Sequence, residues 1–335
     1  MKGPNPFVPW EEGLGSIYGR KEETRIFNSF ANAASSKQGA GMLIIGGPGL
    51  GKTFLMNHFR HRAEKNGLLA PYVKVEKGED AKAVVGKIHH ELSLLPGFKG
   101  GPAPKTFKGL IEKTERFGKF GTVFFIDDVD HMKKVDEAVS KIVRTLKSGW
   151  GKKKAGFVLS STREFRITYE LMGIMRLKPF DEHDARELVE KALKKGPPKM
   201  GEECLHSIMA GSNGNPRLFK TICRHIYDRL RDNEKVMTKG HYLAYLPHIM
   251  SMLSREWFGG MYQETPEAER QILRVLAKSD EGMHVSDIAK KLGKPMGPVT
   301  ALTRRLLDRG QIVRLDRGKY RIFAKLYAKY IVQRS

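Results

Sequence analysis

The sequence predicts an α/β protein in which a parallel sheet is followed by a helical domain and by a C-terminal winged helix-turn-helix. Three observations predict this class. In the first half of the chain, short apolar runs alternate with helical stretches, which is typical of a parallel sheet covered on both faces. Strand signals stop after Pro179, and near the C-terminus three helical patterns precede a hairpin. We place the three domains at residues 1–180, 181–262 and 263–335.

Five short strands and the helices between them make up the first domain. Each strand is a short run rich in apolar residues, and the first one reads Ala-Gly-Met-Leu-Ile-Ile-Gly. Residues 1–16, rich in Pro and Gly, form an irregular arm, and residues 97–105 form a loop. We expect strands at 40–46, 70–76, 122–126, 156–161 and 174–177, and helices at 53–66, 80–95 and 136–147.

The second and third domains are helical up to a C-terminal hairpin. In the second, Pro216 is well placed as a first helical residue, and Pro247 should break or kink its helix. In the third, Gly293 and Gly310 end two helices, and residues 316–318 turn the hairpin. We expect helices at 181–195, 202–210, 216–232, 238–257, 266–278, 285–293 and 298–309, and strands at 311–315 and 319–323.

The charge balance points to an anionic partner. The 335 residues include 60 Lys and Arg against 37 Asp and Glu, a formal net charge of +23. A chain this basic repels itself, so nucleic acid is the first candidate partner. The alternative is a solvated, lysine-rich surface.

Cysteine content and hydropathy indicate a cytoplasmic protein. Cys204 and Cys223 are too few for a disulfide scaffold or a structural zinc site, and they fit a reducing compartment. No apolar run approaches the ~20 residues that a membrane span needs. The N-terminal residues lack the apolar stretch of a signal peptide. We therefore expect a cytoplasmic protein with no membrane partner.

A glycine-rich loop between the first strand and its helix predicts a phosphate site. It has the pattern G-x-x-x-x-G-K-[ST] in the strand–loop–helix context that this motif requires. Its glycines let backbone N–H groups turn towards phosphate oxygens, and the helix N-terminus adds partial positive charge. The lysine should reach the β- and γ-phosphates of ATP, and the threonine hydroxyl should ligate magnesium. The loop consists of Gly46, Gly47, Pro48, Gly49, Leu50, Gly51, Lys52 and Thr53.

Two carboxylates follow the apolar run at 122–126. Asp127 is positioned to hold magnesium, directly or through water, and Asp128 is the candidate base that orients the attacking water. The alternative is that the two acids cap the next segment. Glutamate is usual at the second position, and the shorter aspartate predicts slow ATP hydrolysis.

These motifs resemble those of AAA+-type P-loop ATPases, of the group that contains the STAND ATPases and the archaeal origin-recognition initiators. Residues 19–23 resemble the G-R-x-x-E motif of these families, and the Asp127-Asp128 pair is similar to the D-D of STAND members. Ser161-Thr162-Arg163 resembles their T-T-R sensor, with serine in the first position. Residues 177–180 look like the start of their helical lid domain, and residues 214–217 resemble the G-x-P motif of that lid. The resemblance covers nearly the whole chain.

The resemblance implies roles for four arginines and one threonine. Arg20 would lie near the adenine and the phosphates, and Thr162 and Arg163 would sense the γ-phosphate. Arg217 would be a second sensor, carried by the lid. Arg166 would act as an arginine finger on a neighbour's nucleotide, which implies a homo-oligomer in the ATP state. For each of these arginines except Arg20, the alternative is an ordinary arginine with no such role.

The basic excess is concentrated at the C-terminus. Residues 286–335 hold 13 Lys and Arg against 3 Asp and Glu, a net charge of +10. In the helix-turn-helix mode the third helix enters the major groove, and we expect its exposed face to offer Thr300, Thr303 and Arg304. Arg304 is suited to guanine, and Thr300 to a phosphate or a base edge. Arg317 and Lys319 on the wing should contact phosphates of double-stranded DNA. The alternative is that this module packs on another protein.

Together these features predict an ATP-dependent DNA-binding switch with slow ATPase activity. Replication initiation, transposition or a related DNA transaction is the expected setting. The alternative is a STAND signalling or defence ATPase whose winged helix contacts protein rather than DNA.

Overall fold

Five parallel strands form the sheet predicted for the first half of the chain. Their order is β2-β3-β4-β1-β5, and every pairing between neighbours is parallel. All residues of β1, β3 and β4 are buried, because helices cover both faces and leave no polar side for an alternating pattern. The strands are β1 (Ala40–Ile45), β2 (Tyr72–Lys74), β3 (Thr122–Asp127), β4 (Ala155–Ser161) and β5 (Met172–Arg176).

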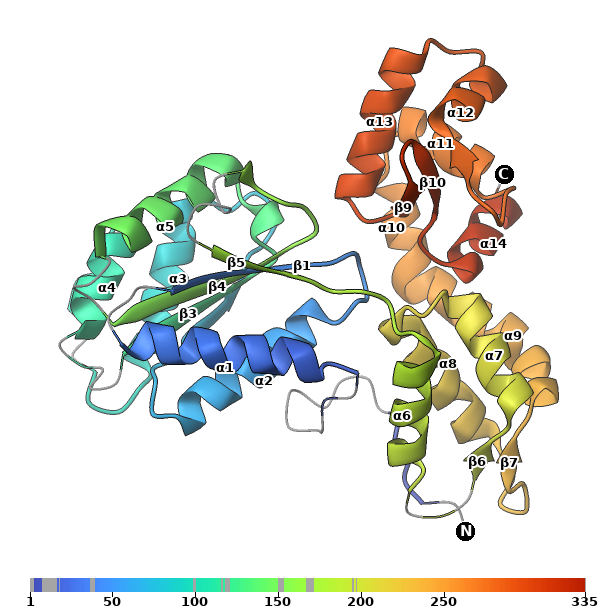
Figure 1. Ribbon diagram of the computed structural model, residues 1–335, viewed down its shortest axis with the longest axis horizontal. Coiled ribbons are helices and arrows are strands. Elements are labelled where there is room, and N and C mark those ends of the chain that lie inside the picture. The colour runs from blue at the N-terminus through green and yellow to red at the C-terminus, as the bar shows by residue number, and fades with distance from the viewer. Residues whose placement is uncertain are drawn as a thin grey trace. The chain divides into compact units, whose positions relative to one another are not determined.

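Helices α1 and α2 cover one face of this sheet, and α3, α4 and α5 cover the other (Figure 1). On the first face, Phe27 of α1 stacks on Phe59 of α2 with ring centroids 4.1 Å apart, and Phe125 of β3 lies beneath them. On the second, apolar residues of α3, α4 and α5 form one buried cluster with the strands. The helices are α1 (Lys21–Ser35), α2 (Lys52–Lys65), α3 (Ala81–Ser93), α4 (Phe107–Glu115) and α5 (Val135–Gly149).

The described chain divides into two compact units. The sheet unit comprises Glu11–Gly46 and Gly51–Leu177, and the C-terminal unit comprises Met1–Trp10, Gly47–Leu50 and Lys178–Ser335. This computed structural model describes residues 3–7, 17, 19–36, 40–98, 101–115, 117, 121–149, 154–166, 172–194, 196 and 198–334.

The N-terminal segment belongs to the C-terminal unit, which corrects its assignment to the first domain. Phe7 is buried against Tyr227 of α8 (Pro216–Arg229), and the Tyr227 hydroxyl donates to the Gly3 carbonyl at 2.9 Å. The Asn5 side-chain amide donates to the Arg224 carbonyl at 3.0 Å. These contacts are long-range, so the irregular composition of the segment does not reveal them.

The first half of the C-terminal unit is helical, as predicted. Pro216 is the first residue of α8, and Asn215 before it accepts a hydrogen bond from the Leu218 N–H at 3.2 Å. Pro247 does not end α9, which continues to Leu253 and then passes into a π-helix at Ser254–Phe258. Two short parallel strands were not predicted, since two residues carry no periodicity. The elements are α6 (Glu182–Ala192), β6 (Lys199–Met200), α7 (Glu202–Ser212), α8 (Pro216–Arg229), β7 (Val236–Met237), α9 (Lys239–Leu253) and α10 (Gly259–Gln263).

The last part of this unit has the three helices and the hairpin expected of a winged helix-turn-helix. We call residues 263–335 the C-terminal module. Gly293 and Gly310 take left-handed conformations directly after α12 and near the end of α13, where the sequence predicts them. A short strand, β8, joins the hairpin to give the order β8-β10-β9. The elements are α11 (Glu267–Leu276), β8 (Met283–His284), α12 (Val285–Leu292), α13 (Met296–Asp308), β9 (Ile312–Asp316), β10 (Lys319–Ile322) and α14 (Lys325–Gln333).

Helices α1, α4 and α14 were not among the predicted elements. In α14, Tyr327 is fully buried among the aromatic rings of Phe258, Phe323 and Tyr330, so the helix completes the core of the module. Across the described ranges, no helix combines the length and the apolar character that crossing a bilayer requires.

Candidate functional site

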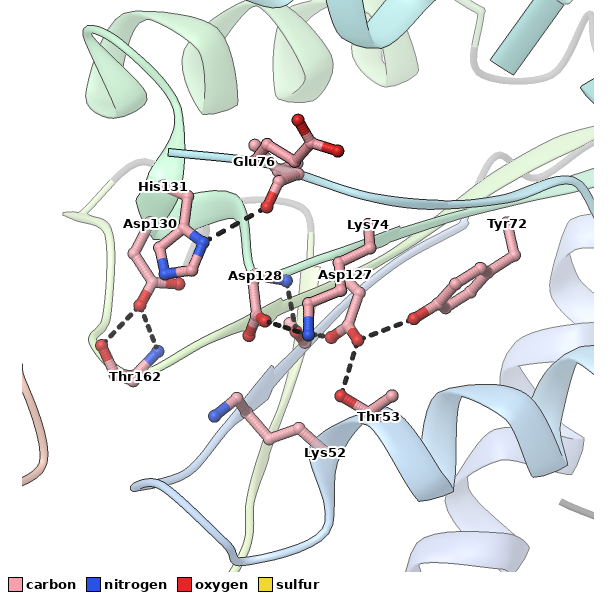
Figure 2. A network of polar contacts seen from close by, with 12 residues as sticks. Lys52, Thr53, Tyr72, Lys74, Glu76, Asp127, Asp128, Asp130, His131 and Thr162 are labelled. Atoms are coloured by element: carbon pink, nitrogen blue, oxygen red, sulfur yellow. Dashed lines mark hydrogen bonds and ion pairs between the residues drawn. The ribbon is translucent and has the colours of Figure 1, made fainter. Parts of the chain in front are cut away.

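Three chain segments with polar residues meet at the carboxyl edge of the sheet. Because β1, β3 and β4 are parallel neighbours, the segments that follow them emerge at the same edge. The backbone register places Ile45 of β1 opposite Ser161 of β4, and the Gly46 N–H continues the pairing by donating to the Ser161 carbonyl at 3.1 Å. The start of the phosphate loop, the two carboxylates and the Ser-Thr-Arg segment are therefore close together (Figure 2).

The phosphate loop ends in a tight turn into α2. Gly51 precedes the helix with a φ of 93°, a conformation that only glycine adopts without strain. Lys52 is the first helical residue, and its ammonium donates to the Gly46 carbonyl at 2.9 Å. The lysine side chain thus folds back over the start of the loop.

Residues 47–50 of the loop lie in the C-terminal unit. There the Arg217 N–H donates to the Gly49 carbonyl at 3.1 Å, and the Asn215 side-chain amide donates to the Pro48 carbonyl at 2.9 Å. Two loop carbonyls are thereby satisfied by the first turn of α8. Gly49 has a φ of 78°, and a Cβ there would lie 2.6 Å from the Asn215 Oδ1, so this position also requires glycine.

Asp127 is a completely buried carboxylate held by three hydroxyl groups. Its Oδ2 accepts from the Thr53 hydroxyl at 2.7 Å and from the Tyr72 hydroxyl at 2.9 Å, and its Oδ1 accepts from the Ser160 hydroxyl. These three partners are neutral, whereas a buried carboxylate is stabilised best by a cation. The oxygen donors of Asp127 and Thr53 are those that magnesium prefers, so the residues present fit a magnesium ion.

Asp128 is held in a strained conformation beside a lysine. Its φ of 55° places a non-glycine residue in the left-handed region, which is uncommon and concentrates at functional sites. The Asp128 N–H donates to the Ser160 hydroxyl oxygen at 2.8 Å, and the carboxylate lies 3.4 Å from the Lys74 ammonium. Strand β4 thus holds the backbone of Asp128, and strand β2 supplies a cation to its side chain.

The Ser-Thr-Arg segment is tied to acids that follow β3. The Asp130 Oδ2 accepts from both the N–H and the hydroxyl of Thr162, at 3.2 and 2.6 Å. The Arg163 guanidinium pairs with Asp136 at 2.8 Å and lies 4.7 Å from the centre of the Phe165 ring. The nearby Asp130 Oδ1 is buried with no hydrogen-bond partner in the described part of the chain.

The other three arginines of the predicted site lie in different surroundings. Arg20 is buried at the start of α1 and pairs with Glu23 at 2.9 Å, so the arginine and the glutamate of the G-R-x-x-E pattern bind each other. Arg166 is exposed. Arg217 places its guanidinium over the ring of Trp257, 4.3 Å from the centre, and burial lowers its pKa. The roles of all three stay predictions.

The C-terminal module corrects one predicted DNA contact. Thr303 is buried, and its hydroxyl donates to the Val299 carbonyl at 2.8 Å, so it does not lie on the exposed face of α13. Helical spacing explains the error, because Thr303 follows Val299 by one turn and shares its inward face. Thr300 and Arg304 are exposed, and Arg304 pairs with Asp308 at 3.2 Å. On the wing, Arg317 is exposed and Lys319 is half-buried.

Sequence reasoning missed Tyr72, Lys74 and Ser160 as neighbours of the two carboxylates. Tyr72 and Lys74 belong to β2, which pairs with β3 so that Lys74 lies opposite Asp127. Ser160 lies on β4, on the other side of β3. The only signal for such a neighbour in the sequence is a polar residue near the end of a strand. That signal becomes informative once the strand order is known.

Comparison with known protein families agrees with this geometry. Residues 35–167, which contain the phosphate loop, both carboxylates and the Ser-Thr-Arg segment, match the AAA domain family. Residues 255–331 match a family described as a domain of unknown function (DUF8462). A comparison with curated protein sequences finds no match.

Solved structures share the fold of this chain over nearly its whole length. A Walker-type ATPase of Pyrococcus abyssi is 14% identical with a TM-score of 0.73, covering 97% of this chain and 99% of that one. The Aeropyrum pernix Orc1 protein, in complex with DNA, is 15% identical with a TM-score of 0.57, covering 98% and 96%. The Aeropyrum pernix Orc2 protein is 13% identical with a TM-score of 0.65, covering 99% and 96%. The chain therefore has an AAA+ P-loop ATPase fold resembling those of archaeal Walker-type ATPases and origin-recognition proteins.

Proposed function

We propose that this AAA-domain protein is an ATP-dependent switch that binds double-stranded DNA. The observation that carries the nucleotide half is the buried Asp127 carboxylate, which shares a hydrogen bond with Thr53 of the phosphate loop. The observation that carries the DNA half is the net charge of +10 on residues 286–335. An initiator-like or transposition-like DNA transaction is the setting that this combination favours.

ATP would be held by the phosphate loop and the first turn of α2. The backbone N–H groups of the loop and the positive end of α2 suit the phosphate oxygens, and Lys52 adds a compact positive charge. Thr53 and Asp127 would hold magnesium, which when bound supplies charge neutralisation to the phosphates. Thr162 and Arg163, which follow β4 at the same edge, are suited to sensing the terminal phosphate.

Asp128 is the residue proposed to orient the attacking water. Its backbone is held by Ser160, so its carboxylate extends from a rigid strand end. The Lys74 ammonium beside it competes with water for the carboxylate oxygens. Both this ion pair and the short side chain favour slow turnover, which suits a switch better than a motor.

DNA would bind at the C-terminal module through its third helix and its hairpin. Arg317 is exposed at the hairpin turn, and Thr300 and Arg304 are exposed on α13. Their charge and exposure suit contacts to the phosphate backbone and to base edges. The fold similarity to the Orc1 protein, which was solved in complex with DNA, also supports the proposal that this chain binds DNA.

A protein-docking role for the module is the second candidate, and two features favour it. Met296 at the start of α13 is 57% exposed and Leu315 of the wing is 42% exposed, so apolar side chains lie on the elements proposed for DNA binding. Arg304, the proposed base reader, is partly neutralised by Asp308. In this alternative, the protein is a STAND-type signalling ATPase.

The deciding experiment is steady-state ATP hydrolysis with and without duplex DNA, together with DNA binding in ATP and in ADP. A DNA-binding switch predicts that the affinity for DNA differs between the ATP-bound and the ADP-bound protein. In Lys52→Ala, neither ATP nor ADP should change the affinity for DNA. ATP hydrolysis with no measurable affinity for duplex DNA at low salt would instead favour the protein-docking role. Absence of ATP binding would refute both.

A further inference from the structure

Tyr72 occupies an unusual place in the nucleotide site. Thr53 belongs to the phosphate loop motif, whereas Tyr72 lies on β2, a strand that carries none of the predicted site residues. Nevertheless the Thr53 and Tyr72 hydroxyls donate to the same oxygen, Asp127 Oδ2, at 2.7 and 2.9 Å (Figure 2). Thr53 and Tyr72 reach that oxygen from different elements, α2 and β2.

The fold holds Tyr72 in this position independently of the phosphate loop. Strand β2 pairs with β3 in parallel, with Tyr72 opposite Phe125 and Lys74 opposite Asp127. The side chain is half-buried. The Tyr72 hydroxyl is the donor in its bond to the Asp127 carboxylate, because an ionised carboxylate can only accept.

A metal-holding carboxylate needs a fixed orientation, and its three donors contribute to that orientation unequally. A terminal carboxylate torsion is broad, so only hydrogen bonds or packing can fix it. Ser160 holds the Oδ1, and Thr53 and Tyr72 hold the Oδ2. Under the proposed function, the Thr53 hydroxyl both donates to Asp127 and offers its oxygen to the metal. The Tyr72 hydroxyl is assigned one role there, which is to donate to Asp127.

We propose that Tyr72 is a positioning residue for the magnesium ion: its hydroxyl orients the Asp127 carboxylate towards the metal. This inference rests on the proposed function, because it needs the nucleotide site to bind magnesium with ATP. Partners of this kind orient the ligands of a metal, and removing one typically costs about 10–100-fold in metal affinity. Tyr72 would act through Asp127, to which its hydroxyl donates.

The test compares wild-type protein with Tyr72→Phe, which keeps the ring and removes only the hydroxyl. Binding of a fluorescent ATP analogue is measured during a MgCl2 titration and, separately, in EDTA. We expect Tyr72→Phe to need about 10-fold more magnesium to reach half of the affinity increase that magnesium produces. Affinity in EDTA should equal that of the wild type, because Tyr72 makes no proposed contact with the nucleotide.

Tyr227→Phe is the matched control, since it removes another tyrosine hydroxyl that donates a hydrogen bond, here to the Gly3 carbonyl in the C-terminal unit. Its magnesium titration should coincide with that of the wild type. The inference is wrong if Tyr72→Phe, shown to be folded by its thermal unfolding curve, has the wild-type magnesium dependence. It is also wrong if affinity falls equally in magnesium and in EDTA, which would indicate a general structural role. A wild-type protein that binds no ATP analogue would refute the proposed function instead.

Discussion

The guanidinium of Arg163 donates two hydrogen bonds to the carboxylate of Asp136, at 3.4 Å from Nη1 and at 2.8 Å from Nη2. The proposed γ-phosphate sensor is thus paired with an acid at the start of α5. Both side chains are partly exposed, and such pairs contribute little to stability. Arg163 can therefore exchange Asp136 for a phosphate at small cost.

Replacing Arg163 should separate ATP binding from ADP binding. Arg163→Ala should weaken ATP binding by about 1.5–3 kcal/mol, the usual value for a hydrogen bond to a charged group. The affinity for ADP should be unchanged. Asp136→Asn is the matched control, and it should bind ATP at least as tightly as the wild type. Isothermal titration with both nucleotides measures this. An equal decrease in affinity for ATP and ADP in Arg163→Ala would remove the sensor role.

Replacing Lys52 should severely weaken binding of both nucleotides. Lys52 supplies the charge that the loop backbone cannot, and alanine has no group to replace it. We expect affinity to fall by roughly ten-fold or more, measured by isothermal titration with ATP and magnesium. Lys65→Ala, an exposed lysine at the other end of α2, should bind as the wild type does. Unchanged affinity in Lys52→Ala would sink the proposed site.

Asp128→Asn should bind ATP normally and hydrolyse it slowly. The amide keeps the shape of the side chain but cannot take a proton from water, and the loss of base assistance costs roughly 10²–10⁴-fold in rate. Steady-state phosphate release measures turnover, and isothermal titration checks that binding is retained. Turnover at the wild-type rate would show that another group orients the water.

Salt dependence should identify the wing as a phosphate-contacting surface. Arg317→Ala and Lys319→Ala in the full chain should each weaken binding to all duplex sequences alike. Removing one phosphate contact should make the slope of log K against log salt shallower by about 0.9. Arg25→Ala, an exposed arginine of α1 paired with Glu22, is the control and should leave the slope unchanged. Slopes that stay at the wild-type value in both wing variants would place the DNA elsewhere.

Sequence discrimination should depend on Arg304 and not on Thr303. Arg304→Ala should reduce the difference between preferred and random duplexes by roughly 1–3 kcal/mol if Arg304 reads a guanine. Thr303→Val should leave DNA binding intact and lower the stability by about 1 kcal/mol, because it removes the buried bond to the Val299 carbonyl. Competition binding and thermal unfolding measure the two effects. Weaker discrimination in Thr303→Val would contradict its buried position.

Features of this protein whose signals are local can be read from the amino-acid sequence. The phosphate loop is readable because its glycines, Lys52 and Thr53 are consecutive, and the carboxylates because Asp127 and Asp128 directly follow an apolar strand. The glycine ends of α12 and α13 are readable because a left-handed residue after a helix favours glycine. The five-strand parallel sheet followed from the alternation of strand and helix patterns along the chain.

Which residues surround these features depends on the tertiary fold. Tyr72 and Asp127 are 55 positions apart in the chain, and only the pairing of β2 with β3 brings the hydroxyl to the carboxylate. Ser160 reaches the same carboxylate because β4 is the other neighbour of β3. Strand order depends on burial shared among distant segments, and no local pattern encodes that shared burial.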